Sequence, residues 1–343
     1  MLTAIGIDIG TSKTVIIRGK NIVLNEHTAI LMDTYDDVPV AFGNDAYKAI
    51  GRNSEKYEVI CPIERGVITN YNAAEYIFEN FISKTTENKI TRPRVIAAIP
   101  CCSTSVERRS IIEALQIAGC RSVVTIETPV AAALGMGIDF SGPGGYTVID
   151  IGAGTTDIAV LSLGRLAKCE SIKLAGVDID QAIINYVKSK YNIIIGIHTA
   201  QMVKHNIGSV IERPFEVGMM IKGINAISLM PDSVEVTDRE LFDVIYETVE
   251  NIFSNISNIL METAPELVGD IKNNGIYLTG GSSLLYGMKE KLSEYLGVNI
   301  ITFDNVETCV SRGLGKILRN KEFLKAGNYN SVKDILLEDV SIP

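Results

Sequence analysis

Two stretches, GIDIGTSKTVIIRG at residues 6–19 and YTVIDIGAGTTDIAVL at residues 146–161, decide the fold of this 343-residue chain. In each, an apolar run ends near an acid, passes through a turn of glycine and hydroxylated residues, and returns as a second apolar run. Laid over each other, the stretches align three pairs of residues: Asp8 with Asp150, Gly10 with Gly152, and Thr14 with Thr156. Either stretch alone is equally typical of a buried acid that caps an ordinary hairpin. Their repetition favours two similar halves that face a shared ligand.

The later parts of the two halves also correspond. Each half shows a buried-strand pattern and then a strand that enters a helix: RVIAAIP (94–100) and VVTIETPVAAALG (123–135) in the first, GIYLTGG (275–281) and NIITFDNVETCVSRGLG (299–315) in the second. Short β-branched runs between helical segments indicate parallel sheets packed on helices. The sequence therefore predicts an α/β fold built by duplication.

Two segments interrupt the halves. Residues 32–62 are rich in turns and short strand patterns, and residues 178–240 contain helical patterns followed by a strand-rich stretch. A long amphipathic helix is predicted after them, because apolar residues recur at spacings of three and four from Leu241 to Leu260. Thr237 and Glu240 form a capping-box pattern before it, and Pro265 is expected to end it.

The composition excludes several classes of protein. The chain is 46% hydrophobic and has a formal net charge of −9, so it lacks the basic surface that a nucleic-acid-binding protein needs. No apolar run reaches the roughly 18 residues of a membrane span, and the first residues lead directly into a strand pattern. We therefore expect a cytoplasmic protein without a signal peptide or an N-terminal amphipathic anchor.

The cysteines and histidines do not form a recognisable reactive or metal-binding motif. The six cysteines have no metal-ligand spacing, and the adjacent Cys101 and Cys102 are poorly placed for a simple disulfide. We interpret the cysteines as small buried hydrophobic residues. The three histidines are scattered, which supports neither a histidine metal site nor a Ser-His-Asp triad.

The repeated turns have the chemistry of an anion site. Backbone N–H groups in a glycine-containing turn can converge on a phosphate, since no bulky side chain blocks its approach. Asp8 and Asp150 would face each other across the cleft between the halves. Mg²⁺ is commonly bound by one or two carboxylates together with phosphate oxygens, which fits such a pair. The first turn lacks the spacing of a Walker A loop, and no Gly-x-Gly-x-x-Gly follows a strand.

A third glycine turn joins the strand pattern around Leu278 to a predicted helix. Gly280 and Gly281 are followed there by Ser282 and Ser283. This turn is either a tight strand-to-helix connection or a platform where the backbone passes close to a nucleotide.

Together these segments resemble the two phosphate motifs and the adenosine motif of the superfamily of actin, sugar kinases and heat-shock chaperone ATPases. Within it the chain is similar to the MreB family of bacterial actins from about residue 4 to 318, notably in GKNIVLNEHTAI, VERRSIIEALQIAG, DQAIINYVKSKY and LTGGSSLL. The resemblance implies a duplicated actin-like (ribonuclease H-like) fold, with ATP and Mg²⁺ between the halves. It also implies self-association into head-to-tail protofilaments that determine bacterial cell shape.

The resemblance also assigns subdomains and site residues. The implied subdomains are IA (1–31, 63–142 and 308–343), IB (32–62), IIA (143–177 and 241–307) and IIB (178–240). The nucleotide would be held by residues of the turns and the nucleoside pocket: Gly10, Thr11, Ser12, Lys13, Gly152, Gly154, Thr155, Thr156, Gln201, Lys204, Gly280, Gly281, Ser282 and Ser283. Asp8 and Asp150 would bind the metal. Thr155, Asp150 and Thr128 would occupy the catalytic positions.

Three positions depart from the family pattern. The first turn usually reads Gly-Thr-Ala-Asn-Thr, whereas this chain has Ser12 and the cation Lys13. The usual glutamate of the nucleoside pocket is Gln201, whose amide can still bond a ribose hydroxyl. Thr128 replaces the second glutamate of Glu-Glu-Pro, which helps to position the attacking water. Glu127 points to the opposite side of an extended segment, so we expect at most a slow ATPase coupled to assembly.

Membrane attachment is expected to be weak. Family members bind the inner membrane through an amphipathic N-terminus or an apolar loop, but here the loop TTENKITRPR (85–94) has Ile90 as its one sizeable apolar residue. Contact with the inner face of the membrane would then be mediated by a protein partner or by another MreB-type protein in a mixed filament.

Two alternatives remain open at this stage. A divergent paralogue in a wall-less bacterium could use such filaments for shape or motility. A sugar kinase of the same superfamily is more remote, because it needs an acid that deprotonates a sugar hydroxyl, and no candidate stands out beyond the nucleotide turns.

Overall fold

A computed structural model describes residues 4–52, 54–86 and 92–319 of the chain. Ile90, on which the prediction of weak membrane attachment depends, lies outside the described residues, and so do residues 320–343. In the part that is described, no helix is both long and apolar enough to cross a membrane.

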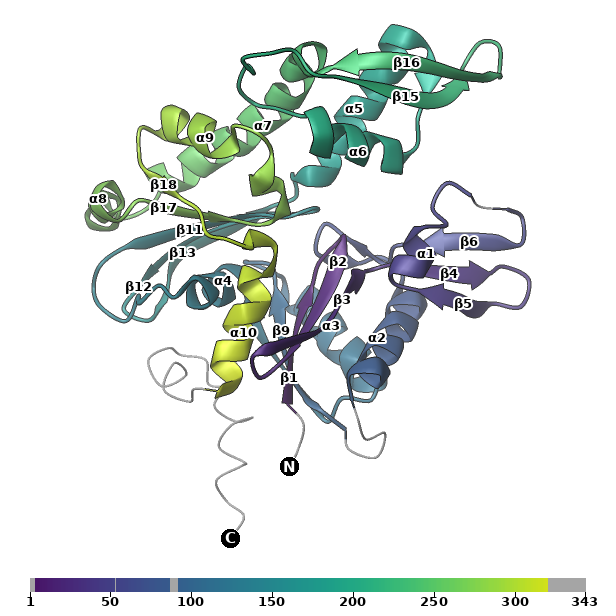
Figure 1. The fold of residues 1–343 in the computed structure, drawn as a ribbon. Helices are drawn as coiled ribbons and strands as arrows, with labels where there is room; N and C mark the ends of the chain where they lie inside the picture. The colour runs from purple at the N-terminus through teal and green to yellow at the C-terminus, as the bar shows by residue number, and fades with distance from the viewer. Residues whose placement is uncertain (1–3, 53, 87–91, 320–343) are drawn as a thin grey trace.

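Two five-stranded sheets of the same topology form the framework of the molecule (Figure 1). The first runs in the order β3 (Asn21–His27), β2 (Lys13–Arg18), β1 (Ala4–Ile9), β9 (Arg94–Ile99) and β10 (Ser122–Glu127). The second runs in the order β13 (Arg165–Ile172), β12 (Thr156–Ser162), β11 (Tyr146–Ile151), β17 (Ile276–Thr279) and β18 (Ile300–Ile301). The matching orders confirm the duplication that the repeated stretches predict.

Each sheet is mixed, which corrects the prediction of parallel sheets. β1 pairs with β2 and β11 pairs with β12 in antiparallel register, because a tight turn joins the strands of each pair. β9 pairs with both β1 and β10 in parallel, and β17 pairs with β11 and β18 in parallel. Only the strands that follow helical crossovers pair in parallel, as predicted. The strands of each hairpin pair in antiparallel register, because a tight turn joins them without a crossover.

Two helices lie between the sheets and hold them together (Figure 1). They are α4 (Thr128–Met136) and α10 (Cys309–Arg319). Their buried residues share one apolar cluster with Ile96 and Ala98 of the first sheet and Val148 and Leu161 of the second. All six residues of β9 are buried, because its other face is covered as well. The central layer therefore fixes how the two halves are placed.

Glycines allow α4 and α10 to approach closely. A Cβ atom added at Gly313 would lie 1.8 Å from the carbonyl oxygen of Ala131, and one added at Gly135 would lie 1.9 Å from that of Cys309. These distances are far below van der Waals contact, and the neighbouring atoms belong to backbone. The helices can therefore cross at this separation only with glycine at both positions.

The outer helices cover the remaining faces of the sheets. The first half carries α2 (Tyr71–Thr85) and α3 (Ser105–Ile117), and the second carries α7 (Asp238–Met261), α8 (Pro265–Asn274) and α9 (Met288–Leu296). Thr237 and Glu240 form the predicted capping box of α7. The helix ends at Met261, ahead of Pro265, which instead opens α8.

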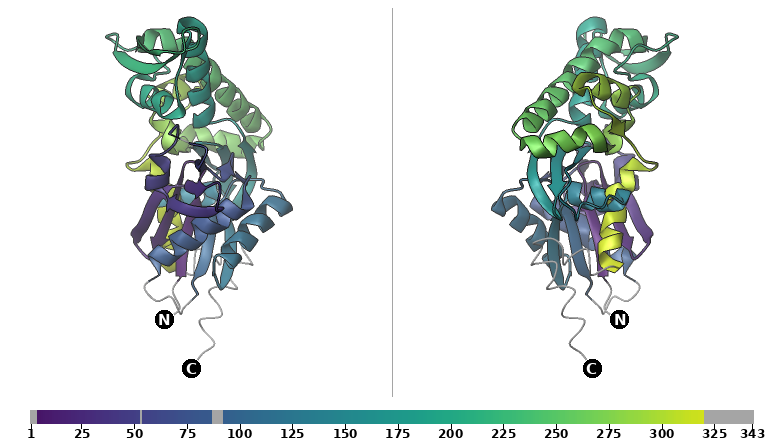
Figure 2. Two further views of the ribbon diagram at one scale, coloured as in Figure 1. Left: turned by 90° about the vertical axis from the view of Figure 1, so that its right-hand side faces the viewer. Right: turned by 90° about the vertical axis from the view of Figure 1, so that its left-hand side faces the viewer.

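Smaller units extend from both halves. The first contains β4 (Ile30–Asp33), β5 (Val38–Phe42), α1 (Asn44–Tyr47) and β6 (Tyr57–Ile60), followed by the hairpin of β7 (Ile63–Glu64) and β8 (Val67–Ile68). The second contains α5 (Gly176–Tyr191), β14 (Ile193–Ile194), α6 (Ile197–Ile207), β15 (Gly218–Asn225) and β16 (Pro231–Thr237). Figure 2 shows the β15–β16 hairpin at the end of the molecule opposite to α10.

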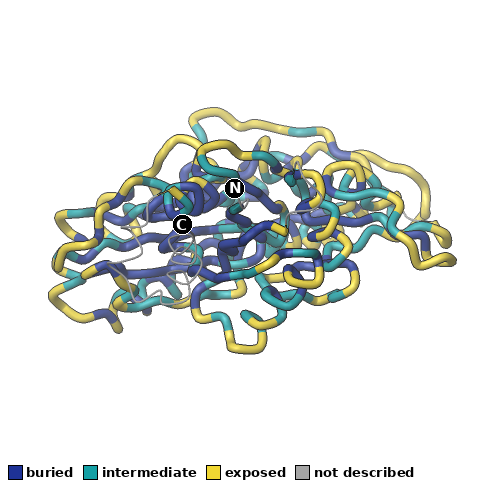
Figure 3. Tube along the Cα trace, turned by 90° about the horizontal axis from the view of Figure 1, so that it is seen from below, coloured by how far each residue is buried: buried dark blue, intermediate teal, exposed yellow. Residues whose placement is uncertain are grey.

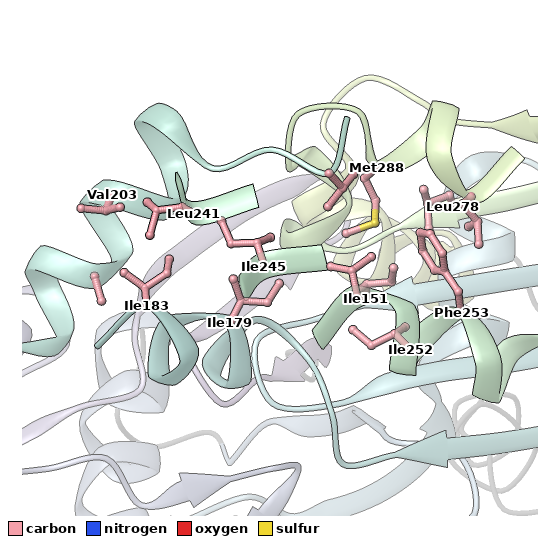
Figure 4. Packing of buried hydrophobic residues seen from close by; sticks show 14 of the residues in the cluster. Ile151, Ile179, Ile183, Val203, Leu241, Ile245, Ile252, Phe253, Leu278 and Met288 are labelled. Atoms are coloured by element: carbon pink, nitrogen blue, oxygen red, sulfur yellow. The ribbon is translucent and has the colours of Figure 1, made fainter. Parts of the chain in front are cut away.

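The apolar core follows this layered arrangement. Ile179 and Ile183 of α5 pack against Leu241 and Ile245 of α7 in the largest cluster (Figure 4), as the periodicity of both segments predicts. Viewed from below in Figure 3, the buried positions follow the central strands and helices, and the exposed positions follow the peripheral loops.

The crossing of α4 and α10 can be tested with one methyl group. We expect Gly313→Ala to lower the free energy of unfolding by about 3 kcal/mol, because the new Cβ meets backbone that cannot rotate away. Gly269 in α8 is the matched control, since a Cβ there meets nothing within 4 Å, and Gly269→Ala should stabilise the helix by about 0.5–1 kcal/mol. Urea unfolding followed by circular dichroism measures both; equal effects would contradict the proposed close crossing.

Candidate functional site

A cleft of about 1580 Å³ opens between the two halves, and most of the predicted site residues line it. They are Asp8, Gly10, Thr11, Ser12, Lys13, Thr128, Asp150, Gly152, Gly154, Thr155, Gln201, Lys204, Gly280, Gly281 and Ser282. Two predicted residues are not among the lining residues. The hydroxyl of Thr156 donates to the carbonyl of Leu174 at 2.8 Å, and that of Ser283 donates to the carbonyl of Gly280 at 2.6 Å. These two side chains therefore stabilise the turns through hydrogen bonds to the backbone and do not line the cleft.

The two repeated turns are built in the same way and meet in the cleft. The N–H of Gly10 donates to the carbonyl of Lys13 at 3.0 Å, and the N–H of Gly152 donates to that of Thr155 at 2.9 Å. Both glycine N–H groups thus close their own turns. Gly154 lies so near the opposite turn that a Cβ would stand 2.3 Å from Oγ1 of Thr11. The remaining N–H groups of both turns consequently border one narrow space.

Asp8 and Asp150 lie at the bottom of this space. Burial and then the nearby Asp157 carboxylate raise the pKa of Asp8 to about 7. Burial, Asp157 and Asp8 together raise the pKa of Asp150 well above its usual range. Neither carboxylate has a basic partner among the ion pairs of the described residues. The site therefore favours whatever would offset this negative charge, such as a proton or a metal cation.

Asp157 is a third buried acid, which the sequence analysis missed. It lines the cleft, accepts a hydrogen bond from the N–H of Cys101 at 2.8 Å, and lies 3.4 Å from the hydroxyl of Thr155. Burial is the main cause that raises its pKa to about 6. A signal was available, since the alignment of the repeats places Asp157 opposite the apolar Val15. An acid in one copy alone marks a chemical difference between the two turns.

The structure also shows the surroundings of the substituted catalytic position. The hydroxyl of Thr128, the first residue of α4, donates to the carbonyl of Ile99 at 2.9 Å. Glu127 forms an ion pair with Arg108 at 3.1 Å and is not among the residues that line the cleft. The expectation that Glu127 points away from Thr128 agrees with this geometry. Neither side chain presents a free carboxylate to the cleft.

Lys13 does not stand alone at the first turn. Its ammonium lies 3.6 Å from the carboxylate of Glu307, which belongs to the short helix η2 (Val306–Thr308) of the opposite wall. The side chains of both residues are close to half exposed, so the pair is weak and can separate. A bound anion would thus compete with Glu307 for Lys13.

Contacts between the two halves cross the mouth of the cleft near Gln201 and Lys204. The hydroxyl of Tyr47 on α1 donates to Gln201 on α6, and Nε2 of His198 lies 2.9 Å from the carbonyl of Tyr47. The Tyr47 ring stacks on His27 at 3.5 Å between centroids and meets His198 edge-on at 4.5 Å. Lys204 forms a buried ion pair with Asp180 at 2.8 Å. Sequence reasoning found Gln201 and Lys204 but missed the aromatic residues, which lie in unrelated segments.

The third glycine turn packs against the second. Gly280 has a φ of 90°, a conformation that strongly favours glycine, and a Cβ there would lie 2.3 Å from Oδ1 of Asp150. The hydroxyl of Ser282, in the short helix η1 (Gly281–Leu284), donates to the carbonyl of Gly152 at 2.7 Å. The three predicted turns therefore form one continuous wall.

Comparison with known proteins identifies the family. A family model described as MreB/Mbl protein matches residues 2–326. The chain belongs to the MreB/Mbl family. Cell shape-determining protein Mbl of Bacillus subtilis is 35% identical over 322 residues, which cover 93% of this chain and 97% of that protein. Cell shape-determining protein MreB of Escherichia coli K12 is 37% identical over 321 residues, which cover 92% of each chain.

Solved structures agree with this assignment to the MreB/Mbl family. MreB 5 of Spiroplasma citri, in a crystal structure bound to AMPPNP, superimposes with a TM-score of 0.88 at 30% identity and covers 95% of this chain and 98% of its own. MamK in a double helical filament superimposes with a TM-score of 0.76 at 15% identity, which compares the fold alone. The predicted actin-like fold of two similar halves is confirmed.

The buried acids of this MreB/Mbl family member predict an unusual pH dependence. A carboxyl whose pKa is raised by folding destabilises the fold progressively as pH rises from its unfolded value, near 4, through about 7. Without nucleotide and divalent cations, Asp8→Asn should therefore stabilise the protein at pH 8, on the order of 2 kcal/mol, and much less at pH 5. Urea unfolding at both pH values measures the difference. Asp36→Asn, which changes an exposed acid, is the control; an Asp8→Asn effect independent of pH would contradict the assignment.

Proposed function

We propose that this chain is an actin-like cytoskeletal protein that binds ATP and Mg²⁺ in the cleft and assembles into protofilaments that determine bacterial cell shape. The observation that carries the proposal is the meeting of two identically closed turns, each preceded by an aspartate that lines the cleft. The curated relatives are named cell shape-determining proteins, and MreB 5 of Spiroplasma citri has structures bound to AMPPNP and to ADP.

The donor set of the cleft fits a metal-bound phosphate. Asp150 is buried and Asp8 is partly buried, neither has a basic partner among the ion pairs of the described residues, and Mg²⁺ prefers carboxylate oxygens of this kind. Thr11, Ser12, Gly154 and Thr155 would contact phosphate through their N–H and hydroxyl groups. When bound, Mg²⁺ would neutralise charge on the phosphate oxygens. Asp157 would orient the hydroxyl of Thr155 toward the place in the cleft where ATP would be hydrolysed.

The nucleoside would lie against the third turn. Gly280, Gly281 and Ser282 provide the wall behind it, and Gln201 lies at its mouth. Lys204 already has Asp180 and the carbonyl of Gly176 as partners at 2.8 and 2.9 Å, so we propose that it shapes the pocket and adds little free charge. Gly10, Gly152, Thr156 and Ser283 would act by holding the turns in shape.

Assembly follows from family membership. We propose that residues 32–62 and 178–240 act as the small subdomains IB and IIB, and that the large subdomains IA and IIA comprise the rest, with the boundaries given above. Filaments would form by head-to-tail contact between copies of this chain. Attachment to the inner face of the membrane would require a protein partner or a second MreB-type filament protein.

Sedimentation tests the proposal directly. The full chain should pellet with ATP and Mg²⁺, and it should remain in the supernatant without nucleotide. Asp150→Ala should weaken the Mg²⁺-dependent binding of ATP by at least roughly tenfold, because it removes one of two metal-binding carboxylates. Turnover of ATP with a sugar and no pelleting would favour the sugar kinase instead.

Thr128 predicts slow hydrolysis. Catalysis of phosphoryl transfer depends on positioning and electrostatic stabilisation, and the Thr128 hydroxyl is already committed to the Ile99 carbonyl. Thr128→Glu would place a carboxylate at the N-terminus of α4, where it is electrostatically tolerated. We expect phosphate release from ATP to rise several-fold, which is less than the roughly 10- to 1000-fold that a well-positioned group of this kind contributes.

Thr128→Met is the matched control, because its side chain has about the length of glutamate but no carboxylate or amide that could orient a water. It should leave phosphate release near the level of the unmodified protein, while ATP binding and pelleting persist in all three proteins. Equal rates for the unmodified protein and Thr128→Glu would show that another group positions the water, and Asp157 is then the residue to change.

A further inference from the structure

Two thiols from opposite halves of the molecule lie side by side outside the nucleotide site. Sγ of Cys102, in the loop that follows β9, is 3.4 Å from Sγ of Cys169 on β13, although the residues are 67 positions apart. The Cys102 thiol also donates a hydrogen bond to the carbonyl of Cys169 at 3.3 Å. The pair thus spans the seam between the two large sheets.

These positions correct the prediction that all the cysteines are buried hydrophobic residues. Cys102 is exposed and Cys169 is partly exposed, whereas Cys101 is buried. Cys102 has a φ of 55°, an uncommon conformation for a residue with a side chain. The prediction failed because the partner of Cys102 comes from the other half of the chain, which local spacing cannot reveal.

The two thiols differ in reactivity. Hydrogen bonds from the thiols of Cys101 and then Cys102 outweigh burial and lower the pKa of Cys169 to about 6. Burial and the interaction with Cys169 raise the pKa of Cys102 to about 11. Since the thiolate is the reactive form, Cys169 is the nucleophile near neutral pH and Cys102 is the thiol held next to it.

We propose that Cys102 and Cys169 are a reversible oxidation site, at which a peroxide forms a disulfide that joins the two halves of the molecule. The thiolate of Cys169 attacks one oxygen of hydrogen peroxide, the O–O bond breaks, and a sulfenic acid forms with release of hydroxide. Cys102 then attacks the Cys169 sulfur and displaces a second hydroxide. The proton of each thiol converts one hydroxide to water, so two thiols and one peroxide give one disulfide and two waters.

The geometry favours this pair over Cys101. A disulfide requires the Cys102 and Cys169 sulfur atoms to approach by about 1.4 Å, which a rotation of an exposed side chain in a loop can provide. Cys101 is 2% exposed, and its N–H is bonded to Asp157 at 2.8 Å. Lys173 and Glu107 form an ion pair at 3.5 Å across the same seam, which holds the two chain segments together.

Peptide mapping tests the oxidation site. The full-length protein is treated with hydrogen peroxide, its free thiols are blocked, and the digest is analysed by mass spectrometry without reduction. We expect the peptides of Cys102 and Cys169 to be linked within one chain and to separate after dithiothreitol. Cys102→Ser and Cys169→Ser should each abolish the link, whereas Cys101→Ala should retain it. A link between Cys101 and Cys169, a link between chains, or no link would overturn the proposal.

The effect on assembly rests on the proposed function and is measured separately. Because the disulfide fixes one contact between the halves, we expect the amount pelleted with ATP and Mg²⁺ to change at least about twofold on oxidation. The change should reverse with dithiothreitol and be absent in Cys102→Ser. If the reduced protein does not pellet at all, the filament proposal fails, and the peptide map still decides the oxidation site. If the disulfide is mapped but pelleting is unaltered, the proposed effect of the disulfide on assembly is wrong.

Discussion

The close crossing of α4 and α10 is the constraint on which the rest of the molecule depends. Gly135 and Gly313 let the two helices touch through their backbones, and each helix also packs on a sheet. The separation of the sheets follows from this contact, and with it the separation of the two turns that end β1 and β11. A wider central layer would move the turn of Thr11 away from Gly154. The geometry of the cleft is thus set by the packing of the central layer beneath it.

The second constraint is electrostatic. Asp8, Asp150 and Asp157 all line the cleft, and burial raises the pKa of each; the charge of Asp157 raises the pKa of Asp8 and Asp150 further, and Asp8 adds to the shift of Asp150. A fold stabilised only by apolar contacts would gain nothing from such a cluster. The cluster makes sense as a site that is completed by a cation. The glycine turns above it supply hydrogen-bond donors, which fits the proposed binding of an anionic ligand that carries a metal.

The sequence revealed the parts of the structure that repeat or are local. The aligned stretches predicted the duplicated sheets and the facing turns, and the capping box of Thr237 predicted the start of α7. It did not reveal contacts between distant segments, such as that of Tyr47 with Gln201 or that of Cys102 with Cys169. Parallel pairing was predicted too broadly, because apolar runs look alike in hairpins and crossovers. Asp157 was visible in the sequence but overlooked, since only its difference from Val15 marks it.

The stacked rings at the mouth of the cleft have a consequence for the rate at which a ligand would leave it. Tyr47 lies between His27 and His198 and bonds to Gln201, so one residue of the first half is held by partners on both sides of the opening. A ligand that leaves past this part of the opening would require these contacts to separate first. Its residence time would then depend on how often the mouth opens as well as on its affinity for the turns. Substitutions at Tyr47 would then change how long a ligand stays bound in the cleft.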